Sequence, residues 1–467
     1  MRTWILAALI AFGVGVGARD LARSDFIPLQ RQMLDFRVAY CAGVAVDTRA
    51  DPYRIEPART CQHRYPAGPL VRSPNLVMPF VSPGYVAATM GAFAALPFPL
   101  AAVLFETLTL VAIALSIALL ARTLRVPLLT AAAAILLSQF PTLTLGQFTG
   151  FELLALMATA AALAAGRDVL AGVLAAGTLI EPHVGIFVVL ALGAWVPRAR
   201  VALVLSALAS LAIAIAATSW SEQLTNLRLN LPAQAVASLH SQDQYGFSYL
   251  LALAGLPDRA ALGLGTASTV VLFVLAIACA RATERAGQRA GIALVPAALS
   301  VTGGAYIHLT QIALAVPAAL LLVKLAPTRL GRMLAGSALV LLAIPWFYPA
   351  MVKGLLAFAL VTCAILIWYL TKGSIRATAC AVVACGLTLW FAENHLPPAE
   401  PVPIVRAWPA DALVEDEWRE FIDGSSGRSA FYIAAKLPTW IGLLALAGSG
   451  VILVRRSPHN EGAPLSP

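Results

Sequence analysis

The chain has 467 residues, of which 60% are hydrophobic and 12% are charged, and its formal net charge is +9. Ordinary soluble domains are about 45–50% apolar and about 25% charged, and a soluble chain of this composition would leave large apolar patches in water. These proportions exclude a soluble enzyme, a disordered chain and a disulfide-stapled secreted domain, and they predict an integral membrane protein. The basic residues stand in short clusters between apolar runs, as the positive-inside rule describes, so we expect no nucleic acid as a partner.

The apolar runs predict an all-α polytopic membrane protein. A helix needs about 20 apolar residues to cross a hydrocarbon core of ~30 Å, and the runs that reach or approach this length predict about 12–14 transmembrane helices. In chain order they are 4–18, 98–121, 127–145, 150–165, 169–180, 184–196, 201–218, 260–280, 291–305, 309–323, 333–348, 354–371, 376–392 and 437–454. The first run follows Arg2 like a signal peptide but lacks a clean cleavage site in a polar context, so we expect an uncleaved helix.

The loop charges predict the orientation. Basic connectors belong on the cytoplasmic side; they are Arg122/Arg125, Arg167, Arg198/Arg200, Arg281/Arg285/Arg289, Lys324/Arg329/Arg332, Lys372/Arg376 and Arg455/Arg456. The long connectors 19–75 and 393–436 then lie outside, with short helices over a cavity mouth. The alternation holds if 76–96, which contains two prolines, is a re-entrant or surface helix; a crossing at 76–96 with one short pair not crossing is the alternative.

Two pairs of short apolar runs meet at polar residues. One junction is Glu181-Pro182-His183, and the other is Tyr306-Ile307-His308. Polar backbone at membrane depth must be buried in protein or face a water-filled cavity. These junctions therefore predict an external cavity into which their side chains point.

The six cysteines predict no metal centre, because no CxxC or Cys/His spacing appears. Neither an EF-hand nor an Asp-x-Asp pattern is present, so we expect no dedicated metal site and no cofactor. Cys41 and Cys61 share the first external connector, where an oxidising compartment permits a disulfide. A disulfide and a pair of free thiols are both compatible with the sequence.

Asp35 is the best candidate for a catalytic group. It lies in Met33-Leu34-Asp35-Phe36-Arg37-Val38-Ala39-Tyr40, after the first apolar run. Helical spacing places Asp35 and Ala39 on one face, and Phe36 and Tyr40 on another. The alternative is a solvated carboxylate paired with Arg31 or Arg37.

These motifs resemble the membrane glycosyltransferases of the GT-C class, and most of all glycosyltransferase family 87, which is polyprenol-phosphate-mannose-dependent and mannosyltransferase-like. The resemblance covers residues 1–325. It is carried by Asp35-Phe36-Arg37-Val38-Ala39-Tyr40, Asp51-Pro52-Tyr53, Gly146-Gln147-Phe148-Thr149, Leu170-Ala171-Gly172-Val173 with Glu181-Pro182-His183, Asp243-Gln244-Tyr245 and Tyr306-Ile307-His308. The sequence departs from the family where Glu181 replaces a lysine and where Asp243 replaces an asparagine.

The resemblance implies a GT-C-like bundle in residues 1–325, with further transmembrane helices and an acidic external loop in residues 326–467. It implies that a sugar, which is mannose in the family, is transferred from a polyprenyl-phosphate donor to a lipid or glycan acceptor with inversion at the anomeric carbon. Membrane lipids are further expected partners. Asp35 would be the general base. Groups that could bind the donor phosphate or substrate are Arg37, Gln147, His183, Gln244 and His308.

Other interpretations of these residues stay open. His308 can serve as a hydrogen-bond partner between helices, and Gln147 can simply cap a helix turn. Glu152 could line the same cavity, whereas Glu106 fits a buried paired residue. Two other classes of function remain: a polymerase or ligase of lipid-linked glycans, which would depend on loop arginines, and a transporter or flippase, which would show repeat symmetry that this sequence lacks.

Overall fold

The protein is built of helices throughout the part of the chain that the structure describes. A computed structural model describes residues 2–22, 33–65, 77–395, 408–409, 412, 414–423 and 430–456. Every regular element in these ranges is a helix, apart from an isolated antiparallel β-bridge between Gln244 and His308. The predicted all-α class is confirmed.

The first half of the chain forms helices of very different lengths. They are α1 (Arg2–Ala22), α2 (Leu34–Asp47), α3 (Ile55–Arg64), α4 (Gly84–Ala94), α5 (Phe98–Leu124), α6 (Leu128–Ile135), η2 (Leu137–Gln139), α7 (Phe140–Leu145), α8 (Thr149–Ala164), α9 (Asp168–Ala175), η3 (Ala176–Ile180), α10 (Pro182–Trp195), η4 (Pro197–Ala199), α11 (Arg200–Ala217), α12 (Trp220–Thr225), η5 (Asn226–Asn230) and α13 (Leu231–Ala237).

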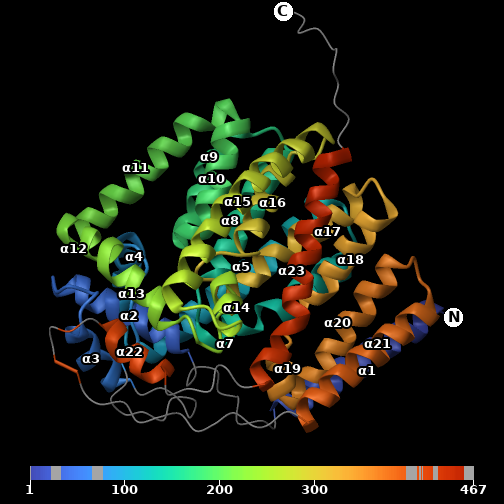
Figure 1. Cartoon of the computed structure of the whole chain (residues 1–467), viewed down its shortest axis with the longest axis horizontal. Helices are drawn as coiled ribbons and strands as arrows, with labels where there is room; N and C mark the ends of the chain where they lie inside the picture. The colour runs from blue at the N-terminus through green and yellow to red at the C-terminus, as the bar shows by residue number, and fades with distance from the viewer. Residues whose placement is uncertain are drawn as a thin grey trace, which may run out of the picture.

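The second half continues the bundle. Its helices are α14 (Phe247–Leu253), α15 (Asp258–Arg285), α16 (Gly291–Ser300), η6 (Leu309–Ala315), α17 (Val316–Leu325), α18 (Arg329–Ala343), α19 (Phe347–Met351), α20 (Lys353–Leu370), α21 (Ile375–His395), α22 (Val414–Asp423) and α23 (Ala430–Arg456). Figure 1 shows α1, α20 and α21 side by side at one edge of the molecule, and α23 running past α15 and α18.

Five helical segments are long and apolar enough to cross a membrane. They are Phe98–Leu124, Leu128–Leu145, Pro197–Ala217, Asp258–Arg285 and Phe431–Arg456, and eight shorter apolar helices of 10–17 residues accompany them. The chain is therefore a helical membrane protein. The full number of crossings and the side that each connector faces stay predictions.

Two of the basic segments can be placed in the bundle. The basic α15–α16 connection and the basic C-terminal end of α23 lie at one end of the molecule, whereas α2, α3 and α22 lie toward the other (Figure 1). Between 77 and 96, the helix α4 has 11 residues, which span about 16 Å at 1.5 Å per residue. That is roughly half of the ~30 Å core, consistent with a segment that does not cross.

The two polar junctions interrupt helices as expected. Glu181 is extended (φ −114°, ψ 93°) and α10 begins at Pro182, because a proline disfavours helical backbone in the residue before it. The predicted run 291–305 is helical only to Ser300. Residues 301–308 leave the helix, and Gly304 takes a φ of +110° that other residues rarely adopt.

The connector that follows the first apolar run folds into a tight unit against α4 and α5. A disulfide joins Cys41 of α2 to Cys61 of α3, which settles the alternative left open by the sequence. Gly43 lets α2 approach α4 closely, since a Cβ there would lie 2.4 Å from the Met90 carbonyl carbon. The Phe36 ring packs against Phe105 with centroids 4.7 Å apart.

The second long connector contributes α22 to the same end of the molecule. This helix packs on α13, and the indole nitrogen of Trp418 donates to the Ser238 hydroxyl at 3.2 Å. The indole of Trp408 donates to Glu420 at 2.9 Å. In the two long connectors, residues 23–32, 66–76, 396–407, 410–411, 413 and 424–429 lie outside the described residues. Arg31 is one of them.

Candidate active site

The carboxylate of Asp35 lies in the first turn of α2, against the α7–α8 turn. The amide nitrogen of Gln147 donates a hydrogen bond of 2.5 Å to Asp35 Oδ2. Asp35 is half-buried, whereas the neighbouring Phe36 is fully buried in the aromatic cluster. The packing of Phe36 therefore fixes the rotation of α2, and this rotation points Asp35 toward Gln147.

Gly146 makes this contact possible. It ends α7 in the left-handed conformation with a φ of +71°, which glycine adopts without steric cost. A Cβ at this position would lie 2.6 Å from the Cβ of Phe36. The α7–α8 turn thus lies directly against the side chain of Phe36, the residue next to Asp35.

A second part of the site is a pair of backbone segments, 241–246 and 304–309. The amide of Tyr245 donates to the Ile307 carbonyl at 2.8 Å, and the amide of Leu309 donates to the Asp243 carbonyl at 3.0 Å. The side-chain oxygen of Gln244 accepts from the amides of Ile307 at 2.7 Å and Gly246 at 2.9 Å. These bonds place Gln244 opposite His308 and Asp243 opposite Leu309.

A chain of polar contacts connects His308 to Glu181. His308 precedes η6 and accepts from the amide of Thr310, while its own amide donates to the side-chain oxygen of Gln311 at 2.9 Å. The amide nitrogen of Gln311 in turn donates to the Glu181 carboxylate. The two polar junctions predicted from the sequence therefore meet through Gln311.

The charges of these groups act on Asp35. Burial raises the pKa of the Asp35 carboxyl to about 6, against the opposing effects of the His308 charge and the Gln147 hydrogen bond. The negative charges of Asp243 and Glu181 raise this pKa further. His308, Asp243 and Glu181 are thus close enough to influence the ionisation of Asp35.

Two predicted site residues lie differently from the rest. Arg37 is buried and donates to the carbonyl oxygens of Tyr65 at 3.2 Å and Gln62 at 3.5 Å, so this guanidinium connects α2 to α3. Burial lowers the pKa of Arg37 to about 10. His183 is exposed and lies 3.9 Å from the Glu181 carboxylate, at the edge of the cluster.

Sequence reasoning missed Gln311 and the role of Tyr306. Burial and the charges of Asp35, Glu181 and Asp243 raise the pKa of the Tyr306 phenol. The Tyr306 ring meets the His183 ring edge to face at 6.4 Å. The signal for Gln311 was its place three residues after His308, the spacing of a capping box.

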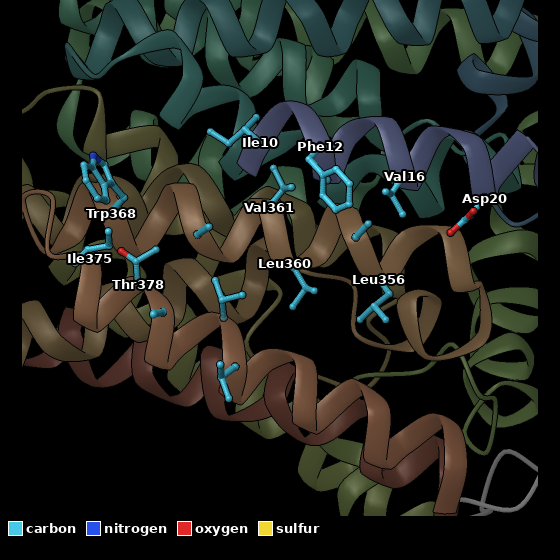
Figure 2. A pocket seen from close by; sticks show the side chains of 16 residues that line it. Ile10, Phe12, Val16, Asp20, Leu356, Leu360, Val361, Trp368, Ile375 and Thr378 are labelled. Carbon is cyan, nitrogen blue, oxygen red and sulfur yellow. The ribbon is translucent and has the colours of Figure 1, made fainter. Parts of the chain in front are cut away.

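A separate groove lies between α1, α20 and α21, with a volume of about 570 Å³. Figure 2 shows side chains from these three helices, including Phe12, Leu360 and Ile375, around the groove. Its lining is apolar apart from Asp20 and Thr378, and the Asp20 carboxylate pairs with Arg19 at 2.9 Å. It contains none of the polar residues of the Asp35 cluster.

Comparison with known proteins adds no relative. No protein-family model, curated protein or solved structure matches this chain. The fold and the site define a helical membrane protein with a buried acidic cluster around Asp35. Its activity is therefore argued from that cluster.

Proposed function

We propose that this protein is a membrane glycosyltransferase. It transfers a sugar, mannose by family resemblance, from a polyprenyl-phosphate donor to a lipid or glycan acceptor on the outer face of a bacterial inner membrane. The observation that carries the proposal is the 2.5 Å hydrogen bond between Gln147 and Asp35, in a carboxylate whose pKa is about 6. The order of motifs along residues 1–325 supports the same class.

The proposed chemistry needs one base. A general base works best when its pKa lies near the operating pH, and the Asp35 carboxylate meets this condition. Asp35 accepts the proton of an acceptor hydroxyl while the hydroxyl oxygen attacks the anomeric carbon. The bond from that carbon to the phosphate oxygen breaks, polyprenyl phosphate leaves with the bonding electrons, and the anomeric centre inverts.

The leaving phosphate needs hydrogen-bond donors that are aimed at its developing charge. In this proposal the His308 imidazole and the Tyr306 hydroxyl supply them, and the exposed His183 meets the phosphate at the edge of the cluster. Gln311 forms hydrogen bonds with both Glu181 and the backbone of His308. In this proposal it fixes the part of the site that binds the donor phosphate relative to Asp35.

In this proposal Arg37 supports the fold of the site, whereas the sequence predicted that it could bind the donor phosphate. Its bonds to the Tyr65 and Gln62 carbonyls make it a support for the α2–α3 unit, beside the Cys41–Cys61 disulfide. Gln244 is likewise mostly engaged, since its side-chain oxygen accepts from two amides. Its side-chain nitrogen is buried and has no partner among the described residues.

The proposal is tested with purified protein in lipid nanodiscs. The protein is incubated with polyprenyl-phosphate sugars labelled in the sugar, together with a lipid extract as acceptor. Transfer of label to a new lipid or glycan, with release of polyprenyl phosphate, is expected. Solute uptake into proteoliposomes without a transfer product would instead favour a transporter, and joining of preassembled oligosaccharides would favour a polymerase or ligase.

A further inference from the structure

The described part of the last apolar helix buries a lysine at the back of the candidate site. Lys436 lies near the start of α23 and is 0% exposed. A lysine at the end of an apolar helix usually extends its ammonium group to the membrane interface. This side chain instead turns inward, so its contacts require an explanation.

The ammonium group is bound by backbone oxygens and an aromatic face. Nζ donates to the Gln244 carbonyl at 2.8 Å and to the Ser241 carbonyl at 3.3 Å, and it lies 3.7 Å from the centroid of the Tyr249 ring. A buried cation is stable only when it is well partnered, and carbonyl oxygens with a cation–π contact meet this need. No described carboxylate forms an ion pair with Lys436.

A second side chain of α23 strengthens the same contact. Trp440 lies one helical turn after Lys436, on the same face. Its indole nitrogen donates to the Tyr245 carbonyl at 3.3 Å. Two consecutive carbonyls, those of Gln244 and Tyr245, are thus held by α23.

We propose that Lys436 is a positioning residue that holds the 241–246 turn against the 304–309 segment and so sets Gln244 opposite His308 and Asp243 opposite Leu309. The turn is bound on both sides: its carbonyls face α23, whereas the Tyr245 amide and the Asp243 carbonyl pair with Ile307 and Leu309. Lys436 touches no reacting group; it acts through the turn. Its effect on sugar transfer rests on the proposed function, whereas its effect on the turn does not.

Hydrogen exchange of the protein in nanodiscs tests the structural part of this inference. Lys436→Met keeps the length of the side chain but loses the donor, and Lys436→Arg keeps a cationic donor. The matched control is Lys324→Met, because Lys324 also donates to a backbone carbonyl, that of Leu124. We expect Lys436→Met to speed exchange in peptides 241–249 and 304–311 by about tenfold, as loss of a buried hydrogen bond does.

The other variants decide between positioning and general destabilisation. Lys436→Arg is expected to restore exchange to within about threefold of the original chain, and Lys324→Met is expected to leave both segments unchanged. Unchanged exchange in Lys436→Met would overturn the inference. If Lys436→Met does not fold, Trp440→Phe replaces it, with faster exchange expected in the same two segments and unchanged exchange again overturning the inference.

Sugar transfer then separates the two proposals. With active protein, Lys436→Met is expected to lower kcat at least about tenfold and Lys436→Arg to recover most of it. Equal kcat in Lys436→Met and the original chain, despite faster exchange in the turn, would overturn the link to catalysis. If no variant transfers sugar while the exchange pattern holds, the proposed function fails and the positioning role of Lys436 stands.

Discussion

The amide nitrogen of Gln147 donates to the carboxylate of Asp35 across a sequence separation of 112 residues. Two features position the groups of this bond: the burial of Phe36 sets the rotation of α2, and the left-handed conformation of Gly146 brings the α7–α8 turn against α2. Burial of the Asp35 carboxyl raises its pKa to about 6.

The pH dependence of transfer reports the ionisation of Asp35. A general base works only as the carboxylate, so activity is expected to be full above the pKa of about 6 and to fall as pH drops through it. Gln147→Leu removes a hydrogen bond that lowers this pKa, so the acidic limb of the kcat/KM profile moves to higher pH. Gln288→Leu, at an exposed position, is the control; an unmoved limb in Gln147→Leu contradicts the assignment.

Glu181→Gln is expected to move the acidic limb the other way. The negative charge of Glu181 raises the pKa of Asp35, so its removal makes Asp35 a carboxylate at lower pH. The glutamine still offers an oxygen to Gln311, which donates to Glu181 in the native chain. The same pH profile measures the shift, and a move of the limb to higher pH would contradict this electrostatic account.

Gly146→Ala tests the close approach of the α7–α8 turn to α2. The methyl group would lie 2.6 Å from the Phe36 Cβ, so α2 must move and Gln147 loses its reach to Asp35. Gly166→Ala is a matched control, because Gly166 has a φ of +72° and nothing within 4 Å of an added Cβ. Both variants carry the backbone strain of about 1 kcal/mol, but only Gly146→Ala should lose most transfer activity. Equal activity in the two would argue against the contact.

His308→Asn separates the imidazole from its capping role. Asparagine also caps helix N-termini, so the bond from the Thr310 amide can persist while the imidazole is lost. We expect kcat to fall about 10²-fold or more, the usual scale for loss of one donor to a developing oxyanion, with the melting temperature little changed. His63→Asn, at an exposed position of α3, controls for the change of residue type; a similar kcat in both variants would exclude His308 from the chemistry.

The sequence predicted the helical class and the two broken junctions because their signals are local. Apolar run length predicts helices, and Pro182 forces Glu181 out of the helix. The Phe36–Tyr40 face also follows from helical spacing, and the two rings lie 6.1 Å apart. Each of these features depends on residues within a few positions of one another.

The contacts that complete the site join residues far apart in the sequence, so local sequence patterns could not predict them. Gln311 meets Glu181 across 130 residues, and Lys436 meets Gln244 across 192. Arg37 was a candidate phosphate ligand by its place beside Asp35, yet its side chain turns to the carbonyls of α3 and its flank. Neighbours in sequence on a helix point in different directions, so only the packing of α2 could separate their roles.

The most direct measurement is sugar transfer by Asp35→Asn, compared with Asp47→Asn at the exposed end of the same helix. Both proteins are purified in nanodiscs and supplied with labelled polyprenyl-phosphate sugar and acceptor lipid. Asparagine preserves the shape of the side chain but cannot accept the proton, so the rate is expected to fall about 10²–10⁴-fold in Asp35→Asn and to stay near the native rate in Asp47→Asn. Equal transfer by the two folded variants would contradict the assignment of Asp35 as the base.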